Sequence, residues 1–356
     1  MQTKIFKMSE ESIDYKALTD CVQIMEKGGI VAFPTETVYG LGVNRDSNQA
    51  LRRLSEIKKR SLNKQFSVHI GPYQRIEDFT SDNSSSIYKL IDKFWPGPLT
   101  LILKAKRRGE KVGLRCPSNR IAQELINRAV NVIAATSANS SGEEPAVDPR
   151  RVLDEFNGNI DALIDSGRTE LAKESSIVDL SEESPKLLRI AAIGKEKIEK
   201  VLNTKVVLFV CTGNSCRSVM AAVLLKEKLK SDAKDDIEVI DAGIATLGGI
   251  SASQPSIELL ARVGIDASKH LSTQLTRRMI RKADLIFAMA RIHEKHILSL
   301  APEAKNRLYL LKEFGQEKDV SKTDIDIVDP IGRSMEVYED CFNIIKQSIE
   351  RVSELI

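Results

Sequence analysis

Short apolar runs alternate with polar, helix-compatible segments along the first two hundred residues. Runs rich in β-branched and apolar residues predict strands within residues 30–42, 65–70, 99–106, 130–136, 162–167 and 175–180. Helical patterns cover Tyr15–Lys27, which Gly28-Gly29 ends, and Gly194–Asn203. This alternation predicts an α/β domain with many strands.

A new β-branched strand begins after Asn203. The expected order is a strand at 206–210, a helix from about Val219, a strand at 237–243, helices around Ile257 and Gln274, a strand at 283–289 and a long helix after Gly332. Such an order predicts a small parallel sheet wrapped by helices, with ligands at the carboxyl ends of its strands. We therefore predict two α/β domains, residues 1–203 and 204–356.

Composition adds limits on the kind of protein. The 356 residues are 42% hydrophobic and 29% charged, which is typical of a globular chain, and the net charge of +3 is too small to indicate nucleic-acid wrapping. Without a membrane-length apolar run or a signal peptide, the chain is expected to be cytoplasmic with no membrane partner. Five scattered cysteines argue against a disulfide framework, and they form no metal-ligand spacing with the four histidines.

The stretch Cys-Thr-Gly-Asn-Ser-Cys-Arg-Ser, residues 211–218, joins a predicted strand to a predicted helix. Gly213 lets the backbone curl so that N–H groups point at one anion, and the helix adds its positive end. These dipoles and the Arg217 guanidinium favour the thiolate of Cys211, which makes it a candidate nucleophile. The alternative is a buried cysteine beside a surface arginine.

This loop resembles that of low-molecular-weight protein tyrosine phosphatases. The resemblance implies that Arg217 clamps two phosphoryl oxygens, that Asn214 holds the loop's shape and that Ser218 donates to the thiolate. Asp329, before Pro330, matches the family's acid, which protonates the leaving group and then activates water. The expected catalytic residues are Cys211, Arg217 and Asp329, and the expected phosphate loop comprises Thr212, Gly213, Asn214, Ser215, Cys216 and Ser218.

The substrate of this loop is less narrowly defined. Ser215 and the Ile331-Gly332 turn look more like the protein-arginine phosphatase branch, so a phosphoarginine protein is favoured, with phosphotyrosine as the alternative. Cys216 either closes a protective disulfide with Cys211 under oxidant or is a small buried side chain. A loop that binds phosphoproteins without cleaving them is disfavoured because both Cys211 and Asp329 are present.

Cations and hydroxyls gather at the strand ends of the first domain and suggest a polyphosphate cleft. Its motifs resemble, in order, those of YrdC-type threonylcarbamoyl-AMP synthases, whose fold implies a twisted mixed sheet. The motifs are FPTETVYGLG (33–42), K-x-R (58–60), WPGPLT (95–100), LRCP (114–117), TSAN (136–139), ESSIVDL (174–180) and LLR (187–189).

The resemblance implies a synthase that joins ATP, L-threonine and bicarbonate for modification of adenosine 37 of tRNA, with tRNA-modification transferase proteins acting downstream. The side chains of such a synthase position the substrates and neutralise their charge. A Mg²⁺ ion accompanies ATP, and phosphate oxygens and water are its main ligands. The residues expected at ATP are Lys58, Arg60, Lys64, Ser137, Asn139, Ser176 and Arg189, and those expected at threonine are Thr35, His69 and Arg115.

Two features leave alternatives open. His69 by itself is equally well interpreted as a satisfied histidine at a strand end. Ser61, Gln65-Phe66 and Ile190-Ala191 replace residues, mostly prolines, that are usual in the family, which loosens the loops. The alternative function is a non-catalytic RNA-binding module, which predicts salt-sensitive RNA binding without threonine-dependent release of pyrophosphate.

Overall fold

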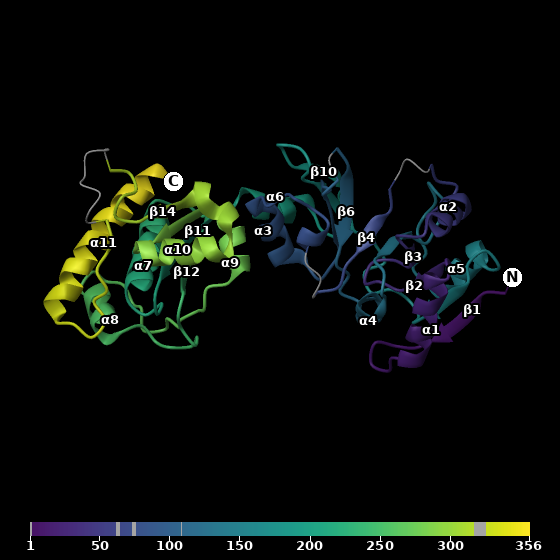
Figure 1. Cartoon of the computed structure of the whole chain (residues 1–356), viewed down its shortest axis with the longest axis horizontal. Helices are drawn as coiled ribbons and strands as arrows, with labels where there is room; N and C mark the ends of the chain where they lie inside the picture. Colours follow the sequence, from purple (N-terminus) through teal and green to yellow (C-terminus); the bar gives the residue numbers. More distant parts are fainter. Residues whose placement is uncertain (1, 62–64, 73–75, 108, 317–324) are drawn as a thin grey trace. The chain divides into compact units, whose positions relative to one another are not determined.

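The computed structural model describes residues 2–61, 65–72, 76–107, 109–316 and 325–356. The chain divides into two compact units, Met1–Asp82 with Leu90–Glu199 and Asn83–Lys89 with Lys200–Ile356 (Figure 1). This division differs from the expected boundary after Asn203 in two respects. The second unit begins four residues earlier, inside a helix, and it includes the short segment 83–89.

The described strands of the first unit form one ten-stranded mixed sheet, in the order β1-β8-β2-β3-β7-β4-β6-β5-β9-β10. The sheet combines parallel pairs, such as β1 with β8, and antiparallel pairs, such as β2 with β3. The strands are β1 (Lys4–Lys7), β2 (Val31–Phe33), β3 (Gly40–Asn44), β4 (Ser67–His69), β5 (Leu99–Lys104), β6 (Lys111–Arg115), β7 (Ile133–Ser137), β8 (Ala162–Asp165), β9 (Ser176–Asp179) and β10 (Lys186–Arg189).

Both faces of this sheet are covered because successive strand side chains point to opposite sides. Phe33 packs with α1 and α4, whereas its neighbour Ala32 packs with α2 and α5. Asp14 caps α1 by accepting from the amides of Lys16 and Ala17. The helices are α1 (Tyr15–Glu26), α2 (Asn48–Ile57), η1 (Ile76–Asp78), α3 (Ser85–Phe94), α4 (Arg120–Arg128), α5 (Pro149–Phe156) and α6 (Lys195–Asn203).

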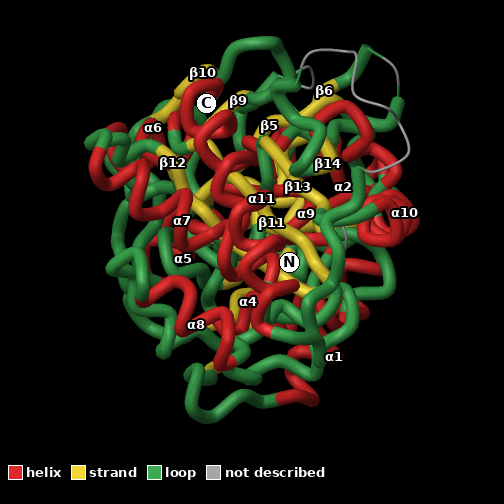
Figure 2. The backbone as a smooth tube through the Cα atoms, turned by 90° about the vertical axis from the view of Figure 1, so that its left-hand side faces the viewer, coloured by secondary structure: helices red, strands yellow, loops and turns green. Residues whose placement is uncertain are grey.

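The second unit has a four-stranded, all-parallel sheet in the order β12-β11-β13-β14. Central β11 is buried on both faces: Phe209 packs with α7 and α11, and Val210 with α9 and α10. The strands, yellow in Figure 2, are β11 (Lys205–Cys211), β12 (Ile237–Gly243), β13 (Leu285–Ala288) and β14 (Leu308–Leu310). The helices are α7 (Arg217–Ser231), α8 (Gln254–Ala261), α9 (Arg277–Lys282), α10 (Arg291–Leu300), η2 (Pro302–Arg307) and α11 (Met335–Leu355).

The expected class, a mixed-sheet α/β domain followed by a parallel-sheet α/β domain, is confirmed. Some elements differ from expectation. The run at 30–42 is two antiparallel strands, β2 and β3, and the helix expected around Gln274 begins at Arg277. The edge strands β1 and β14 and helix α10 were not predicted. Among the described helices, none combines the length and apolar character needed to cross a bilayer.

Candidate active sites

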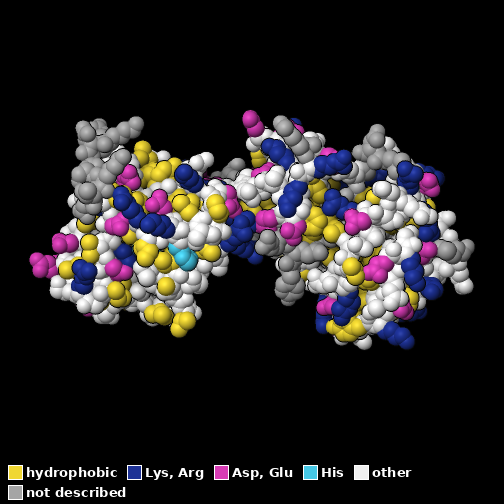
Figure 3. All heavy atoms as spheres, in the orientation of Figure 1, with side chains coloured by type: hydrophobic (Ala, Val, Ile, Leu, Met, Phe, Trp, Pro, Cys, Tyr) yellow, Lys and Arg dark blue, Asp and Glu magenta, His cyan; other side chains and the backbone are white. Residues whose placement is uncertain are grey.

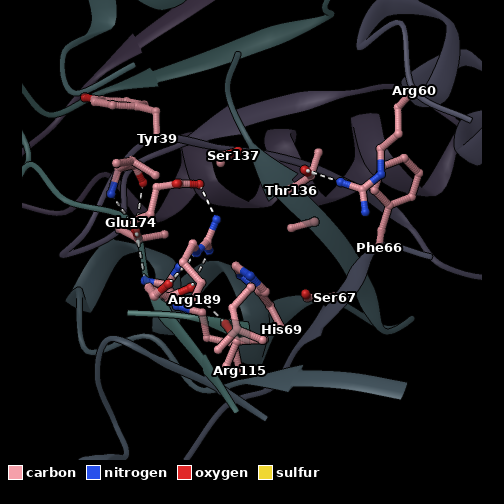
Figure 4. Close-up of a pocket in the computed structure, with 17 residues that line it drawn as sticks. Tyr39, Arg60, Phe66, Ser67, His69, Arg115, Thr136, Ser137, Glu174 and Arg189 are labelled. Atoms are coloured by element: carbon pink, nitrogen blue, oxygen red, sulfur yellow. Dashed lines mark hydrogen bonds and ion pairs between the residues drawn. The ribbon is translucent and has the colours of Figure 1, made fainter. Parts of the chain in front are cut away.

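A cavity opens on the first unit where the ends of several strands meet, with an empty volume of about 670 Å³ that includes open solvent. Guanidinium groups from three separate elements enter its wall: Arg60 follows α2, Arg115 ends β6 and Arg189 ends β10. Figure 4 shows Arg60 approaching Thr136 from one side and Arg189 turned toward Glu174 on the other. The cavity therefore concentrates positive charge at strand ends that lie far apart in the sequence.

Arg115 is fixed by the turn between β2 and β3. Its Nη2 donates to Glu36 Oε1 at 2.8 Å and to Thr37 Oγ1 at 2.6 Å, and lies 3.3 Å from Thr35 Oγ1. Arg115 and Glu36 are 6% and 3% exposed, so this is a buried ion pair. The Arg115 Nε is buried and has no hydrogen-bond partner among the described residues.

His69 ends β4 beside Arg115 and also lines the cavity. Burial, and secondarily the Arg115 charge, lowers the pKa of His69 to about 3, so its imidazole is neutral at pH 7. Its edge packs at 90° against the Phe33 ring, and within the described part of the chain its Nδ1 has no hydrogen-bond partner. The side chain thus brings one unused ring nitrogen to a polar site.

Arg189 and Arg60 are less deeply buried than Arg115. Arg189 Nε donates to Ser175 O at 2.8 Å, its Nη2 to Ser175 Oγ at 3.2 Å, and its Nη1 forms a short contact with Glu174. Arg60 stacks over the Phe66 ring at 5.1 Å. Burial lowers the pKa of both guanidinium groups, although both remain charged near neutral pH.

Lys58 does not line the cavity and instead lies behind the residues that do. Its Nζ contacts the carbonyl of Ser137 and lies 3.1 Å from Asn139 Oδ1, which also accepts from Ser137 Oγ at 2.6 Å. Burial, with a smaller effect of Arg60, lowers the pKa of Lys58 to about 8. Lys58 therefore fixes the end of β7, where Ser137 enters the cavity.

The second site lies at the carboxyl end of β11, where the chain turns through residues 211–217 into α7. Cys211 Sγ is 3.0 Å from Ser218 Oγ and accepts from the Asn214 amide at 3.3 Å. Burial raises the pKa of the Cys211 thiol, and the hydrogen bonds and the Arg217 charge oppose this shift without reversing it. The expected preference for the thiolate therefore stays a prediction, because burial works against it while the hydrogen bonds and Arg217 work for it.

Arg217 bridges the loop to the segment before α11. Its Nη1 donates to Ile327 O at 2.9 Å, and its Nη2 donates to Thr212 Oγ1 at 3.2 Å and forms a short ion pair with Asp329. Arg217 is 4% exposed, whereas the Asp329 side chain is 36% exposed. Because Asp329 offsets the Arg217 charge, less of that charge acts on Cys211.

Asn214 gives the loop its shape. It has a left-handed φ of +54°, its Nδ2 donates to Ser218 Oγ at 2.9 Å and Asp241 Oδ2 at 2.5 Å, and its Oδ1 accepts from the Thr273 amide at 2.7 Å. Asparagine tolerates this conformation better than most residues. Gly213, which was expected to allow the curl, is not among the residues with positive φ.

Comparison with known proteins identifies both units. The Sua5/YciO/YrdC family, described as telomere recombination, matches residues 23–191, and the low molecular weight phosphotyrosine protein phosphatase family matches residues 206–356. A putative threonylcarbamoyl-AMP synthase of Mycobacterium tuberculosis is 30% identical over 208 residues, which are 56% of this chain and 95% of that protein. The chain belongs to the Sua5/YciO/YrdC family, fused to a low-molecular-weight phosphatase domain.

Other relatives share the first unit. The threonylcarbamoyl-AMP synthase of Pyrococcus abyssi is 37% identical over 50% of this chain and 55% of its own length. The chain spans little more than half of this relative and of the Bacillus subtilis enzyme. A crystal structure of P. abyssi Sua5 complexed with L-threonine has the same fold, with a TM-score of 0.54 at 22% identity over 98% of both chains.

In the YrdC-type unit, six of the ten expected ligand residues line one cavity, namely Thr35, Arg60, His69, Arg115, Ser137 and Arg189. Lys58 and Asn139 support it from behind, and Lys64 lies outside the described residues. Placing Ser176 in the site is wrong: it is fully buried, donates to Ile193 O and accepts from the amides of Ala191 and Ile193. Sequence reasoning missed its neighbour Ser175, together with Glu174, Thr136 and Phe66.

In the phosphatase-type unit, the structure brings Arg217 into contact with both Thr212 and Asp329, and Ser218 into contact with Cys211. The backbone of Ser215 contacts the start of α8, where its carbonyl accepts from the amide of Ser253 at 2.8 Å. Both Cys211 and Cys216 are free thiols, so their disulfide remains a prediction.

Residues that the sequence motifs did not single out complete the phosphatase-type site. Asp241 and Thr273 hold Asn214, and His293 contacts Thr212. Gly243 on β12 lies so close to the loop that an added Cβ would be 2.6 Å from Thr212 O. None of these residues stands in a local motif with Cys211, because Asp241 and Gly243 come from β12, His293 from α10 and Thr273 from the loop before α9.

Proposed function

We propose that the YrdC-type unit forms threonylcarbamoyl-AMP from L-threonine, bicarbonate and ATP, for transfer to tRNA by separate proteins. The observation that carries this proposal is the convergence of Arg60, Arg115 and Arg189 on one cavity. Their charges complement a triphosphate, a bicarbonate and an amino-acid carboxylate. The names of the curated relatives, threonylcarbamoyl-AMP synthases, support the same chemistry.

In the proposed reaction the neutral threonine amine attacks the bicarbonate carbon, and one water molecule leaves as the carbamate forms. A carbamate oxygen then attacks the α-phosphorus of ATP and pyrophosphate leaves. Arg115 would pair with the threonine carboxylate, with His69 and Thr35 beside it, and Arg60, Arg189 and Ser137 would hold phosphates. The unit contributes position and charge neutralisation rather than a nucleophile.

Magnesium is proposed to enter with ATP. Among the described residues, no three side chains of His, Cys, Asp or Glu gather as a metal site, which suits an ion held mainly by phosphate oxygens and water. Glu174 is the carboxylate in the cavity wall and would add an oxygen ligand once Arg189 turns to a phosphate. The bound ion would neutralise charge on the departing pyrophosphate.

Release of pyrophosphate from ATP, measured with and without threonine and bicarbonate, tests this function. We expect release only with both substrates, and a loss of about a hundredfold in Arg189→Met because a charge-stabilising group is removed. RNA binding that is salt-sensitive, with no such release, would instead support the non-catalytic module. On the face in Figure 3, Lys and Arg side chains are interspersed with Asp and Glu rather than gathered in one stripe, which favours the synthase.

We further propose that the phosphatase-type unit hydrolyses phosphoproteins through Cys211. The observation that carries this proposal is the meeting of the Cys211–Arg217 loop with Asp329, which lies 112 positions after Arg217. A phosphoryl group would replace Asp329 as the partner of Arg217, which would leave the Asp329 carboxyl free to protonate the leaving group. Substrate binding and release of the acid are thereby linked.

The proposed chemistry has two displacements. The Cys211 thiolate forms an S–P bond as the bond to the leaving group breaks, and Asp329 gives that group its proton. Asp329 then takes a proton from water, which attacks phosphorus and breaks the S–P bond to release phosphate. Cys211→Ser should lose turnover and still bind phosphate; turnover equal to that of the unaltered protein would refute the assignment.

Phosphoarginine is proposed as the preferred substrate and phosphotyrosine as the alternative. The basis is Ser215 in the loop and Ile331-Gly332 after the acid, where Ile331 is 57% exposed. Replacing Ser215 by Ile should shift relative kcat/KM toward aryl phosphates, since it exchanges a hydroxyl for an apolar group. An unchanged ratio for phosphoarginine and phosphotyrosine peptides would remove this basis.

A further inference from the structure

A chain of polar contacts leads from the phosphate loop into helix α10. Arg217 Nη2 donates to Thr212 Oγ1 at 3.2 Å, and His293 Nε2 lies 2.9 Å from the same oxygen. His293 occupies the first turn of α10 and is fully buried. A residue 81 positions from Thr212 is therefore one hydroxyl away from the guanidinium.

The polar interaction of His293 is confined to that contact. Its Nδ1 has no hydrogen-bond partner among the described residues. Burial, and then the Arg217 charge, lowers the pKa of His293 to about 4, so the ring is neutral and adds no second cation beside Arg217. Since a buried polar atom without a partner is unfavourable, an apolar side chain of similar size would serve packing better. The contact of Nε2 with Thr212 Oγ1, rather than packing, therefore accounts for an imidazole at this position.

We propose that His293 is a positioning residue for Arg217 and acts through the Thr212 hydroxyl. The hydroxyl has one proton and accepts from Arg217. In either tautomer, the contact with Nε2 restrains rotation of the Thr212 side chain, so its oxygen keeps facing Nη2.

Arg217 is then held at two nitrogens, because its Nη1 also donates to Ile327 O at 2.9 Å. Its Nε is buried and has no hydrogen-bond partner among the described residues. This inference rests on the proposed phosphatase function. In that function, a guanidinium that is already held in the binding orientation meets the phosphoryl oxygens without reorganising.

The test compares His293→Leu and His293→Gln in the full chain, with His296→Leu as the matched control on the same helix. Leucine removes the contact, whereas the glutamine amide extends to about the place of Nε2. We expect His293→Leu to lower kcat/KM for an aryl phosphate and to weaken binding of inorganic phosphate, each by about tenfold to a hundredfold. His293→Gln should recover most of both, and the urea midpoint of His293→Leu should not fall.

A double-variant cycle with Thr212→Val separates positioning from a general structural effect. If His293 acts through Thr212, the double variant is no worse than Thr212→Val alone, whereas multiplying losses overturn the proposal. Phosphate affinity, measured by calorimetry, needs no turnover. An unaltered protein that hydrolyses no phosphoester therefore refutes the proposed function, and His293→Leu that binds phosphate as tightly as the unaltered protein refutes this inference.

Discussion

Buried ionic contacts in the cavity of the YrdC-type unit define the roles of single residues. Arg115 and Glu36 are both nearly inaccessible and form an ion pair, and Arg115 also lines the cavity. A buried ion pair adds little net stability, but removing one partner leaves an uncompensated charge. The same arginine is therefore needed by the fold and by the proposed threonine site.

Arg115→Met should lower the free energy of unfolding of the first unit by about 3–5 kcal/mol, because Glu36 loses its partner in a buried place. Urea denaturation followed by the fluorescence of Trp95, the chain's single tryptophan, measures this change. The control is Lys111→Met on the same strand, whose ion pair with Asp179 is half exposed at the lysine and should cost under about 1 kcal/mol. Equal losses in the two variants would contradict the buried-pair argument.

His69, the single histidine of the first unit, predicts a pH dependence of stability. Its folded pKa of about 3 is below the unfolded value, so between these values only the unfolded chain binds the proton. Stability that is present above about pH 6.5 should fall as the pH decreases, by up to about 1.4 kcal/mol per pH unit. Urea midpoints between pH 6.5 and 5 should show this slope, and His69→Gln should flatten it. The Arg115 charge lies beside residue 69 both in the unaltered protein and in His69→Gln.

At the scale of elements, both sites depend on how neighbouring strands and loops pack. Neighbouring residues of a strand point to opposite sides, so a shift of one residue exchanges the cavity for the core. Sequence motifs identified the Ser175-Ser176 pair but not which serine faces the cavity. That choice follows from the packing of β9 between β5 and β10.

Gly243→Ala should disturb the phosphate loop more than the fold. Its added Cβ would lie 2.6 Å from Thr212 O and 3.0 Å from the Asn214 amide, so the loop must move. We expect kcat/KM for an aryl phosphate to fall by about a hundredfold, since a displacement near 1 Å has that effect. Gly213→Ala is the control, because its Cβ would meet only Ser215 Oγ at 3.5 Å. A larger loss in Gly213→Ala would refute this explanation.

For the whole molecule, the important feature is that each unit has its own sheet and its own buried clusters. The two proposed reactions use residues from separate units. Variants that remove one site should therefore leave the other reaction unchanged, since distant sites without shared partners act additively.

Cys211→Ser and Arg189→Met test this independence in the full chain. Each should abolish or strongly reduce its own reaction and leave kcat/KM of the other within about twofold, which corresponds to about 0.4 kcal/mol. Both activities are measured on the same preparation, and the double variant should combine the two single losses. A marked loss of phosphatase activity in Arg189→Met would show coupling between the units.

The sequence by itself determined what is local: two α/β units, the strand-loop-helix around Cys211 and the cationic motifs of the first unit. Contiguous residues and their hydrophobic period encode these features. Only the tertiary structure decided that Ser175 faces the cavity instead of Ser176, that Glu174 pairs with Arg189, and that His293 reaches the Cys211 loop. These contacts join residues through packing, and burial raises the pKa of Cys211 and lowers that of His69. Both depend on neighbours that sequence separation does not reveal.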